Sequence, residues 1–89
     1  MMTIDKNELN IYEVEALHKD LLNLFNNADV IVDMSKVNKI DMSVLQLLHA
    51  TQKSCMQASK VFQLKNINKE LLKIFHSAGC ESLVGNSND

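Results

Sequence analysis

The chain contains no proline and no tryptophan, and only two of its 89 residues are glycine. Loops that cradle phosphate groups need several closely spaced glycines, so the two glycines, Gly79 and Gly85, exclude the usual nucleotide-binding motifs. No apolar run approaches the roughly 18 residues that span a bilayer. The opening sequence, MMTIDKNEL, also lacks the apolar stretch of a signal peptide. We therefore expect a cytoplasmic protein without direct membrane insertion.

Cysteine and positive charge are also scarce. The two cysteines, Cys55 and Cys80, fit free thiols in a reducing compartment. The net charge is −2 and no basic cluster is visible, so a nucleic-acid-binding surface is not expected. A chain of this length has room for one domain, which we expect to cover residues 1–89 with a frayed tail at 85–89.

The central stretch of the chain combines a strand pattern with a helix pattern. Residues 30–32, Val-Ile-Val, are typical of a strand buried on both faces. Apolar residues recur at helical spacing from Val44 onward, and Asp41 precedes them in the position of a helix N-cap. Residues 34–40 form a loop between the strand and the helix. In α/β proteins this edge of the sheet is where sites are usually built.

The remaining segments predict an α/β fold. We expect short strands at residues 1–4 and 8–10, a helix from about Tyr12 to Asn27, and a strand at 61–64. A last helix begins after its cap, Asn68, and ends at Gly79. The order β(β)αβαβα predicts a small sandwich, with a mixed, mostly parallel sheet of about four strands covered by three main helices.

Each helix pattern separates an inner from an outer face. The expected inner positions are Val14, Leu17, Leu21, Leu24, Phe25 and Ala28 in the first helix, Val44, Leu45, Leu47, Leu48, Cys55 and Ala58 in the second, and Leu71, Leu72, Phe75 and Ala78 in the third. Five polar positions of the second helix are expected to be solvated: Gln46, His49, Gln52, Lys53 and Gln57.

Three segments in a fixed order resemble the STAS domain family. They are ELNIYEVEALHKDLL (Glu8–Leu22), VIVDMSKVNKIDMSVLQLL (Val30–Leu48) and VFQLKNINKELLKIFHSAGC (Val61–Cys80). That family includes anti-sigma-factor antagonists, the C-terminal domains of sulfate-type anion transporters, and the small STAS subunit of an ABC system that maintains lipid asymmetry. The compact length resembles the stand-alone bacterial branch.

The resemblance implies that the start of the second helix is a docking segment. In the antagonists, a partner kinase phosphorylates the Ser or Thr that directly follows an Asp. Here Asp41 matches that Asp, but the next residue is Met42, which has no hydroxyl group. Ser43 matches the following small residue, and Val44 stands where a Gly is usual. Ser43 is therefore the remaining candidate for phosphorylation. The alternative is that Ser43 has no regulatory role and is simply a residue that the first helical turn tolerates.

The resemblance further implies a non-enzymatic protein-interaction module without a cofactor. Its partner would be an anti-sigma-type, histidine-kinase-like ATPase or another signalling protein. The alternative is an accessory subunit of an ABC-type lipid transporter that docks on its ATPase. The predicted partner-binding residues are Ser35, Lys36, Lys39, Asp41, Met42, Ser43 and Leu45. Around this loop Met34, Met42 and Val44 supply apolar contacts, although Val44 and Met42 could instead pack inward.

Other residue combinations have structural explanations. Asp33 and Asp41 flank the loop, as the two carboxylates of a general acid–base site would, but helix capping already explains Asp41. The three histidines, His18, His49 and His76, fall on three helices without metal-ligand spacing. We expect Cys55 to be a core residue, and no base is placed near Cys80 by the sequence. These residues therefore predict neither a catalytic site nor a metal site.

Overall fold

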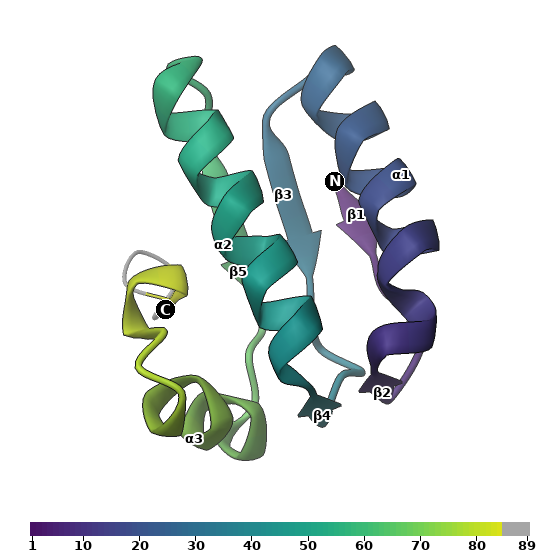
Figure 1. Ribbon diagram of the computed structural model, residues 1–89, viewed down its shortest axis with the longest axis vertical. Coiled ribbons are helices and arrows are strands. Elements are labelled where there is room, and N and C mark those ends of the chain that lie inside the picture. The colour runs from purple at the N-terminus through teal and green to yellow at the C-terminus, as the bar shows by residue number, and fades with distance from the viewer. Residues whose placement is uncertain (85–89) are drawn as a thin grey trace.

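A computed structural model describes residues 1–84 and confirms the α/β class (Figure 1). The expected tail at residues 85–89 lies outside the described residues. The strands are β1 (Met2–Thr3), β2 (Glu8–Leu9), β3 (Val30–Asp33), β4 (Lys39–Ile40) and β5 (Phe62–Lys65). The helices are α1 (Val14–Asn27), α2 (Met42–Gln57) and α3 (Lys69–Ser77), with short 3-10 turns η1 (Ile11–Glu13) and η2 (Glu81–Leu83).

The strands form two parallel sheets where a single sheet of about four strands was expected. The larger sheet has the order β1-β3-β5, and the smaller sheet consists of β2 and β4. Met2 pairs with Val32 on one side of β3, and Phe62 pairs with Val30 on the other. The two residues of β4 lie in the segment that was predicted to be a loop. They pair with β2, because the loop turns back beside the start of the chain.

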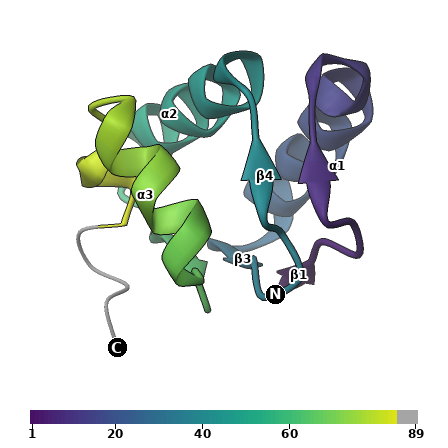
Figure 2. The same ribbon diagram turned by 90° about the horizontal axis from the view of Figure 1, so that it is seen from below.

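The two long helices cover one face of the larger sheet. Figures 1 and 2 show α1 and α2 side by side on the same side of β1 and β3, with α3 near β4. Along β3, Val30 and Val32 are buried while Ile31 and Asp33 are only half-buried. The prediction that this strand is buried on both faces is therefore wrong, because the helices pack on one face only.

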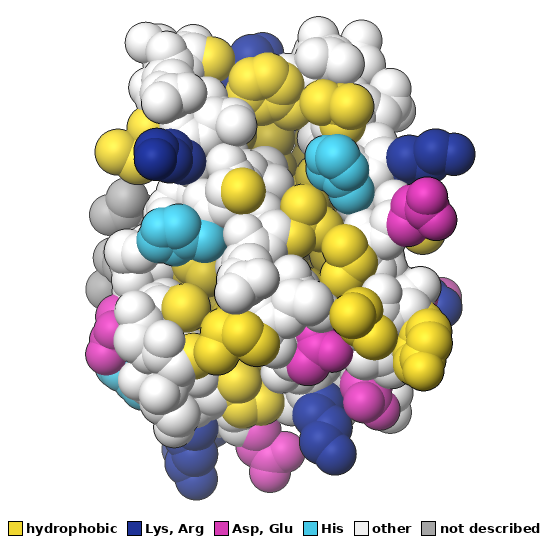
Figure 3. Space-filling model, in the orientation of Figure 1, with side chains coloured by type: hydrophobic (Ala, Val, Ile, Leu, Met, Phe, Trp, Pro, Cys, Tyr) yellow, Lys and Arg dark blue, Asp and Glu magenta, His cyan; other side chains and the backbone are white. Residues whose placement is uncertain are grey.

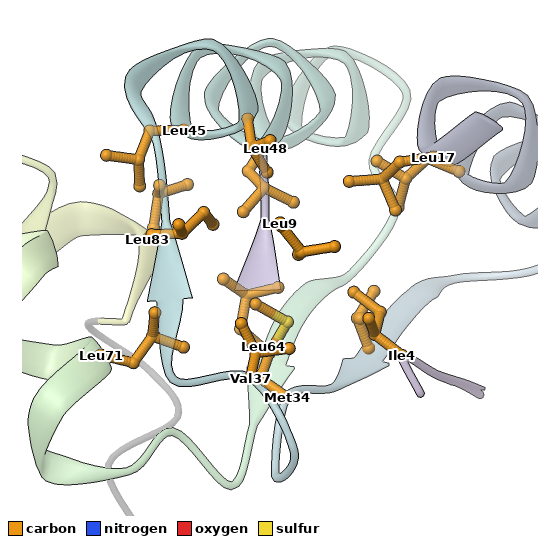
Figure 4. Close-up of a cluster of buried hydrophobic side chains, with 14 of the residues drawn as sticks. Ile4, Leu9, Leu17, Met34, Val37, Leu45, Leu48, Leu64, Leu71 and Leu83 are labelled. Atoms are coloured by element: carbon orange, nitrogen blue, oxygen red, sulfur yellow. The ribbon is translucent and has the colours of Figure 1, made fainter. Parts of the chain in front are cut away.

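A hydrophobic core lies between these helices and the sheets, and the buried residues it contains are all apolar. Figure 4 shows Ile4 and Leu17 facing one another between the β1 segment and α1, with Leu48 directed from α2 toward the centre. Leu71 and Leu83 join the same core from α3 and η2. The core therefore joins α2 to the first helix and to the α3 and η2 segments.

The helix ends follow the capping pattern of the sequence. The Asn68 side chain accepts a hydrogen bond from the Leu71 N–H at 2.9 Å, and Gly79 has a φ of +71°, so the predicted cap and stop of α3 are confirmed. The second strand ends at Leu9 and not at Asn10, because the Asn10 side chain accepts from the Tyr12 N–H at 2.9 Å and starts η1.

Several positions differ from the predicted faces. Ala28 and Ala58 are exposed, because each lies just past the end of its helix. Gln52 is not simply solvated, since its side-chain amide donates to the Ser82 carbonyl at 2.9 Å and ties α2 to η2. The last strand begins at Phe62, while Val61 is exposed. Within residues 1–84, no helix has both the length and the apolar character needed to cross a bilayer.

Candidate functional site

The candidate site is built around Asp41, the residue that joins β4 to α2. Its backbone is extended, and its carboxylate accepts hydrogen bonds from the Val44 N–H at 3.2 Å and from the Ser43 hydroxyl at 2.6 Å. The predicted N-cap is therefore confirmed. The Ser43 hydroxyl is half-buried and already has an acceptor inside the protein.

These donors hold the Asp41 carboxylate in its charged form. The Ser43 hydroxyl is the main cause that lowers the pKa of Asp41, and the N–H groups of Val44, Ile11 and Ser43 lower it further. The N–H of Ile11 belongs to η1, so the start of the first helix also faces this carboxylate. Asp41 thus links the starts of the two long helices.

Three exposed apolar side chains lie at these helix starts, and we call them the helix-start patch: Ile11, Tyr12 and Met42. Leu9 pairs with Ile40 in the small parallel sheet. Ile11 comes two residues after Leu9, and Met42 comes two residues after Ile40, so the two strands lead to Ile11 and Met42 from neighbouring positions. Ile11 is 62% exposed, Tyr12 89% and Met42 53%. The exposure of Met42 means that its side chain does not pack inward as the alternative prediction allowed.

Sequence reasoning missed Ile11 and Tyr12 as parts of this patch. The sequence did contain one signal for them. Ile11 and Tyr12 are an apolar pair that comes just before the inner-face residues of α1 and does not belong to that set. Only the parallel pairing of β2 with β4 brings that pair to the start of α2. Large exposed hydrophobic side chains that cluster in this way are typical of protein-binding surfaces.

The loop beside the patch is held by polar contacts. Asp33 accepts hydrogen bonds from the Ser35 N–H at 3.0 Å and from the Asn66 amide at 3.1 Å, which lower its pKa. The Lys36 ammonium pairs with Asp5 at 2.9 Å. Ser35 and Lys36 are exposed, and so is Lys39. The loop therefore presents these three predicted residues to solvent in a defined conformation.

A shallow apolar groove runs between α1 and α2. Figure 3 shows hydrophobic side chains along the seam between the two helices, with histidine and lysine side chains around it. Leu22 and Phe25 of α1 and Leu47 and Ala50 of α2 line this groove, and His18 also lines it. The groove is a second exposed apolar feature beside the helix-start patch.

Comparison with known proteins identifies the family. A family model described as "Mlab, STAS domain" matches residues 6–85. The chain belongs to the STAS family. No curated protein matches this STAS domain.

The STAS fold also appears in the comparison with solved structures. The crystal structure of a sulfate transporter family protein from Wolinella succinogenes is similar, with a TM-score of 0.72. The sequences are 18% identical, and the match covers 94% of this chain and 70% of the other. At this level of identity the similarity shows a shared fold.

Three residues that were candidates for partner contacts of this STAS domain lie in its core, and for Val44 this is the inward packing that the alternative allowed. Leu45 is only 2% exposed, so it cannot contact a partner without unfolding of the helix start. Met34 is fully buried, as is Val44, and neither provides the apolar contact that was expected around the loop. Val37 is also buried in what seemed a polar loop, because the loop folds back over the core.

The acidic side chains of the site, Asp33 and Asp41, accept hydrogen bonds that favour their charged form. Hydrogen bonds lower the pKa of both Asp33 and Asp41. A general acid at neutral pH needs a raised pKa, which is the opposite shift. The two carboxylates therefore cap and brace their loop.

The histidines and cysteines do not gather into a common site. Among residues 1–84, no three His, Cys, Asp or Glu side chains are placed to hold a metal ion. His76 pairs with Glu81 at 3.3 Å on the surface. Cys55 is buried as predicted, and this burial is the main cause that raises the pKa of its thiol. Cys80 is half-buried, with its sulfur 3.6 Å from the Ala78 carbonyl oxygen.

Proposed function

We propose that this STAS domain is a non-enzymatic, cytoplasmic interaction module that binds a protein partner through the starts of its first two helices. The observation that carries the proposal is the exposed side chain of Met42 beside Ile11 and Tyr12. Exposed side chains of this kind add little to the stability of the free domain, but they gain free energy when a partner covers them.

Polar residues around the helix-start patch would select the partner. Ser35, Lys36 and Lys39 are exposed at the neighbouring loop. Lys36 already pairs with Asp5, whereas Lys39 has no ion pair within residues 1–84. A partner with an apolar contact flanked by an acidic group would complement this surface, since opposite charges at an interface rim favour the correct encounter.

Binding through this surface would not depend on phosphorylation. Met42 cannot accept a phosphate group, and the Ser43 hydroxyl donates to Asp41. A phosphate on Ser43 would remove that donor and place a second negative group beside a carboxylate whose pKa is already lowered. We therefore propose constitutive docking. Mass mapping of the protein from its native cell should find Ser43 unmodified, and a phosphate there would contradict constitutive docking.

Two kinds of partner fit the proposal. The first is a signalling ATPase of the anti-sigma, histidine-kinase-like type, which would make the chain an antagonist in transcription control. The second is the ATPase of an ABC-type lipid transporter, with the chain as an accessory subunit. The family description, which names Mlab, favours the second candidate.

Site-specific crosslinking in the native cell tests the proposal. A photoreactive phenylalanine derivative would replace Met42 in one variant and Met56 in a matched control. Met56 is on the same helix, is 72% exposed, and lies at the opposite end from the patch. We expect a crosslinked ATPase from position 42 that is missing from position 56. A kinase-like ATPase would support the first candidate and an ABC subunit the second. The same products from both positions, or none from position 42, would contradict the proposed docking surface.

A further inference from the structure

The strand β1 is an open edge of the larger sheet. Within residues 1–84 it pairs only with β3, and the Ile4 N–H that follows it donates to the Asp33 carbonyl at 3.2 Å. Successive residues of a strand direct their backbone groups to opposite sides, so the N–H and C=O groups of Thr3 and Asp5 point away from β3. Thr3 and Asp5 are exposed, and on the side away from β3 no other strand within residues 1–84 pairs with β1.

The opposite edge, β5, is covered. There the Val61 and Lys65 carbonyls accept hydrogen bonds from β3, so the backbone groups of Phe62 and Leu64 point outward. Phe62 is half-buried and Leu64 is fully buried. The outward backbone groups of Leu64 are therefore out of reach of an added strand, whereas those of Thr3 and Asp5 belong to exposed residues.

A hollow lies directly beside this open edge. It has a volume of about 170 Å³ and extends between β1 and α1. Ile4 and Leu17 supply apolar walls, and they point toward one another at this side of the core in Figure 4. Met2 lies on the same face of the sheet as these residues and lines the hollow as well. The hollow is large enough to accept an aliphatic side chain.

One carboxylate beside the hollow has no ion-pair partner in the part of the chain that the structure describes. Asp20 lines this hollow and also a second one farther along α1 toward Leu24. The other acidic side chains of the lining are neutralised, since Glu13 pairs with Lys6 at 3.2 Å and Asp5 pairs with Lys36. Asp20 is exposed and forms no ion pair within residues 1–84. This edge therefore has an apolar recess and an unpaired negative charge side by side.

From this combination we infer a second binding site, in addition to the helix-start patch. An extended, cationic segment of a partner protein adds to the sheet along β1. Its backbone pairs with Thr3 and Asp5, and one apolar side chain enters the hollow. Residues two apart in a strand lie on the same face, about 6.5–7 Å from one another, so a Lys or Arg two positions away reaches Asp20. Backbone pairing supplies affinity, while the recess and the charge supply selectivity.

Two synthetic heptapeptides test this site on the intact chain, one that alternates valine with lysine and one that alternates valine with glutamate. Binding is measured by fluorescence anisotropy at low salt and mapped by amide NMR. We expect the lysine peptide to bind at least about fivefold more tightly than the glutamate peptide, because only the former complements Asp20. We also expect slowed hydrogen exchange at the amides of Thr3 and Asp5.

Three variants sharpen the test. Asp20→Lys should weaken lysine-peptide binding by about fivefold to tenfold, while Glu70→Lys, the same change of charge on an exposed position of α3, should leave it unchanged. Thr3→Pro removes the outward N–H and should abolish binding of the peptide. If that variant folds poorly, the amide mapping on the unsubstituted chain decides whether the peptide binds at β1.

Four outcomes would overturn the inference. They are equal binding of both peptides, an unchanged affinity in Asp20→Lys, perturbed amides in the α1–α2 groove and not at β1, or dimerisation of the chain that Thr3→Pro abolishes. The last outcome would assign the edge to a second copy of the chain.

Discussion

Replacing Met42 by aspartate should disrupt partner binding and leave the fold intact. Full burial of a methionine side chain is worth about 1.5–3 kcal/mol. Because Met42 is already about half covered, with 53% of its surface exposed, roughly 1 kcal/mol remains to be gained in a complex. A carboxylate at this position would also lose its water shell on binding, which costs about 1–3 kcal/mol more when it finds no partner.

These two losses add up to a large change in affinity. Each 1.4 kcal/mol changes a dissociation constant tenfold, so Met42→Asp should weaken binding about thirtyfold or more. The free domain should lose less than about 1 kcal/mol of unfolding free energy, since the side chain is on the surface and is not part of the core. Titration calorimetry with the crosslinked partner gives the affinity, and urea denaturation gives the stability.

The matched variant Met56→Asp carries the same change at the far end of α2. It should bind like the unsubstituted domain, since Met56 lies away from the helix-start patch. An unchanged dissociation constant in Met42→Asp, or an equal loss in both variants, would refute the reasoning that Met42 is covered by the partner.

Three further substitutions test the fold and the site. Leu48→Ala removes a fully buried side chain and should cost about 2–5 kcal/mol in urea denaturation; a smaller loss would mean that α2 does not pack as described. Ser43→Ala removes the main cause of the lowered pKa of Asp41, so NMR titration should show that pKa returning toward its ordinary value. A lowered carboxyl pKa stabilises the fold above the unfolded-state pKa, and this contribution is lost as the pH falls through the folded-state pKa. The variant's loss of stability should therefore appear at neutral pH and vanish in acid; a deficit that persists in acid would contradict this cause. Asn68→Ala removes the cap of α3 and the amide contact with the Val37 carbonyl, and it should lower the unfolding free energy by about 1–2 kcal/mol; an unchanged midpoint would show that these contacts are dispensable.

Local signals in the sequence were sufficient for most of the secondary structure. Asp41 and Asn68 cap helices because a side-chain oxygen before an apolar helical pattern has free N–H groups within reach. Gly79 ends α3 because it adopts a positive φ at low cost. The short strands were harder to delimit, since β4 has only two residues and its pairing depends on the distant segment β2.

Burial around the loop was the main error in the prediction of the site. Leu45 and Met34 look like candidates for partner contacts when the loop is taken as exposed, but both are in the core. Met34 lies beside β5, where its N–H donates to the Lys65 carbonyl, and Leu45 lies beside Leu83 of η2 in Figure 4, so both burials involve segments far apart in the chain. Ile11 and Tyr12 show the reverse case, since nothing local marks them as neighbours of Met42.

The sequence by itself determined the α/β class, the family resemblance, the cap at Asp41 and the missing hydroxyl at Met42, because each depends on residue type and on spacing along the chain. Only the tertiary structure decided which side chains at the central segment face solvent. Parallel pairing of β2 with β4 brought Ile11 beside Met42, and one-sided packing of the helices left the edge of β1 open. Both are contacts between distant residues, and a local pattern of apolar and polar positions does not encode them.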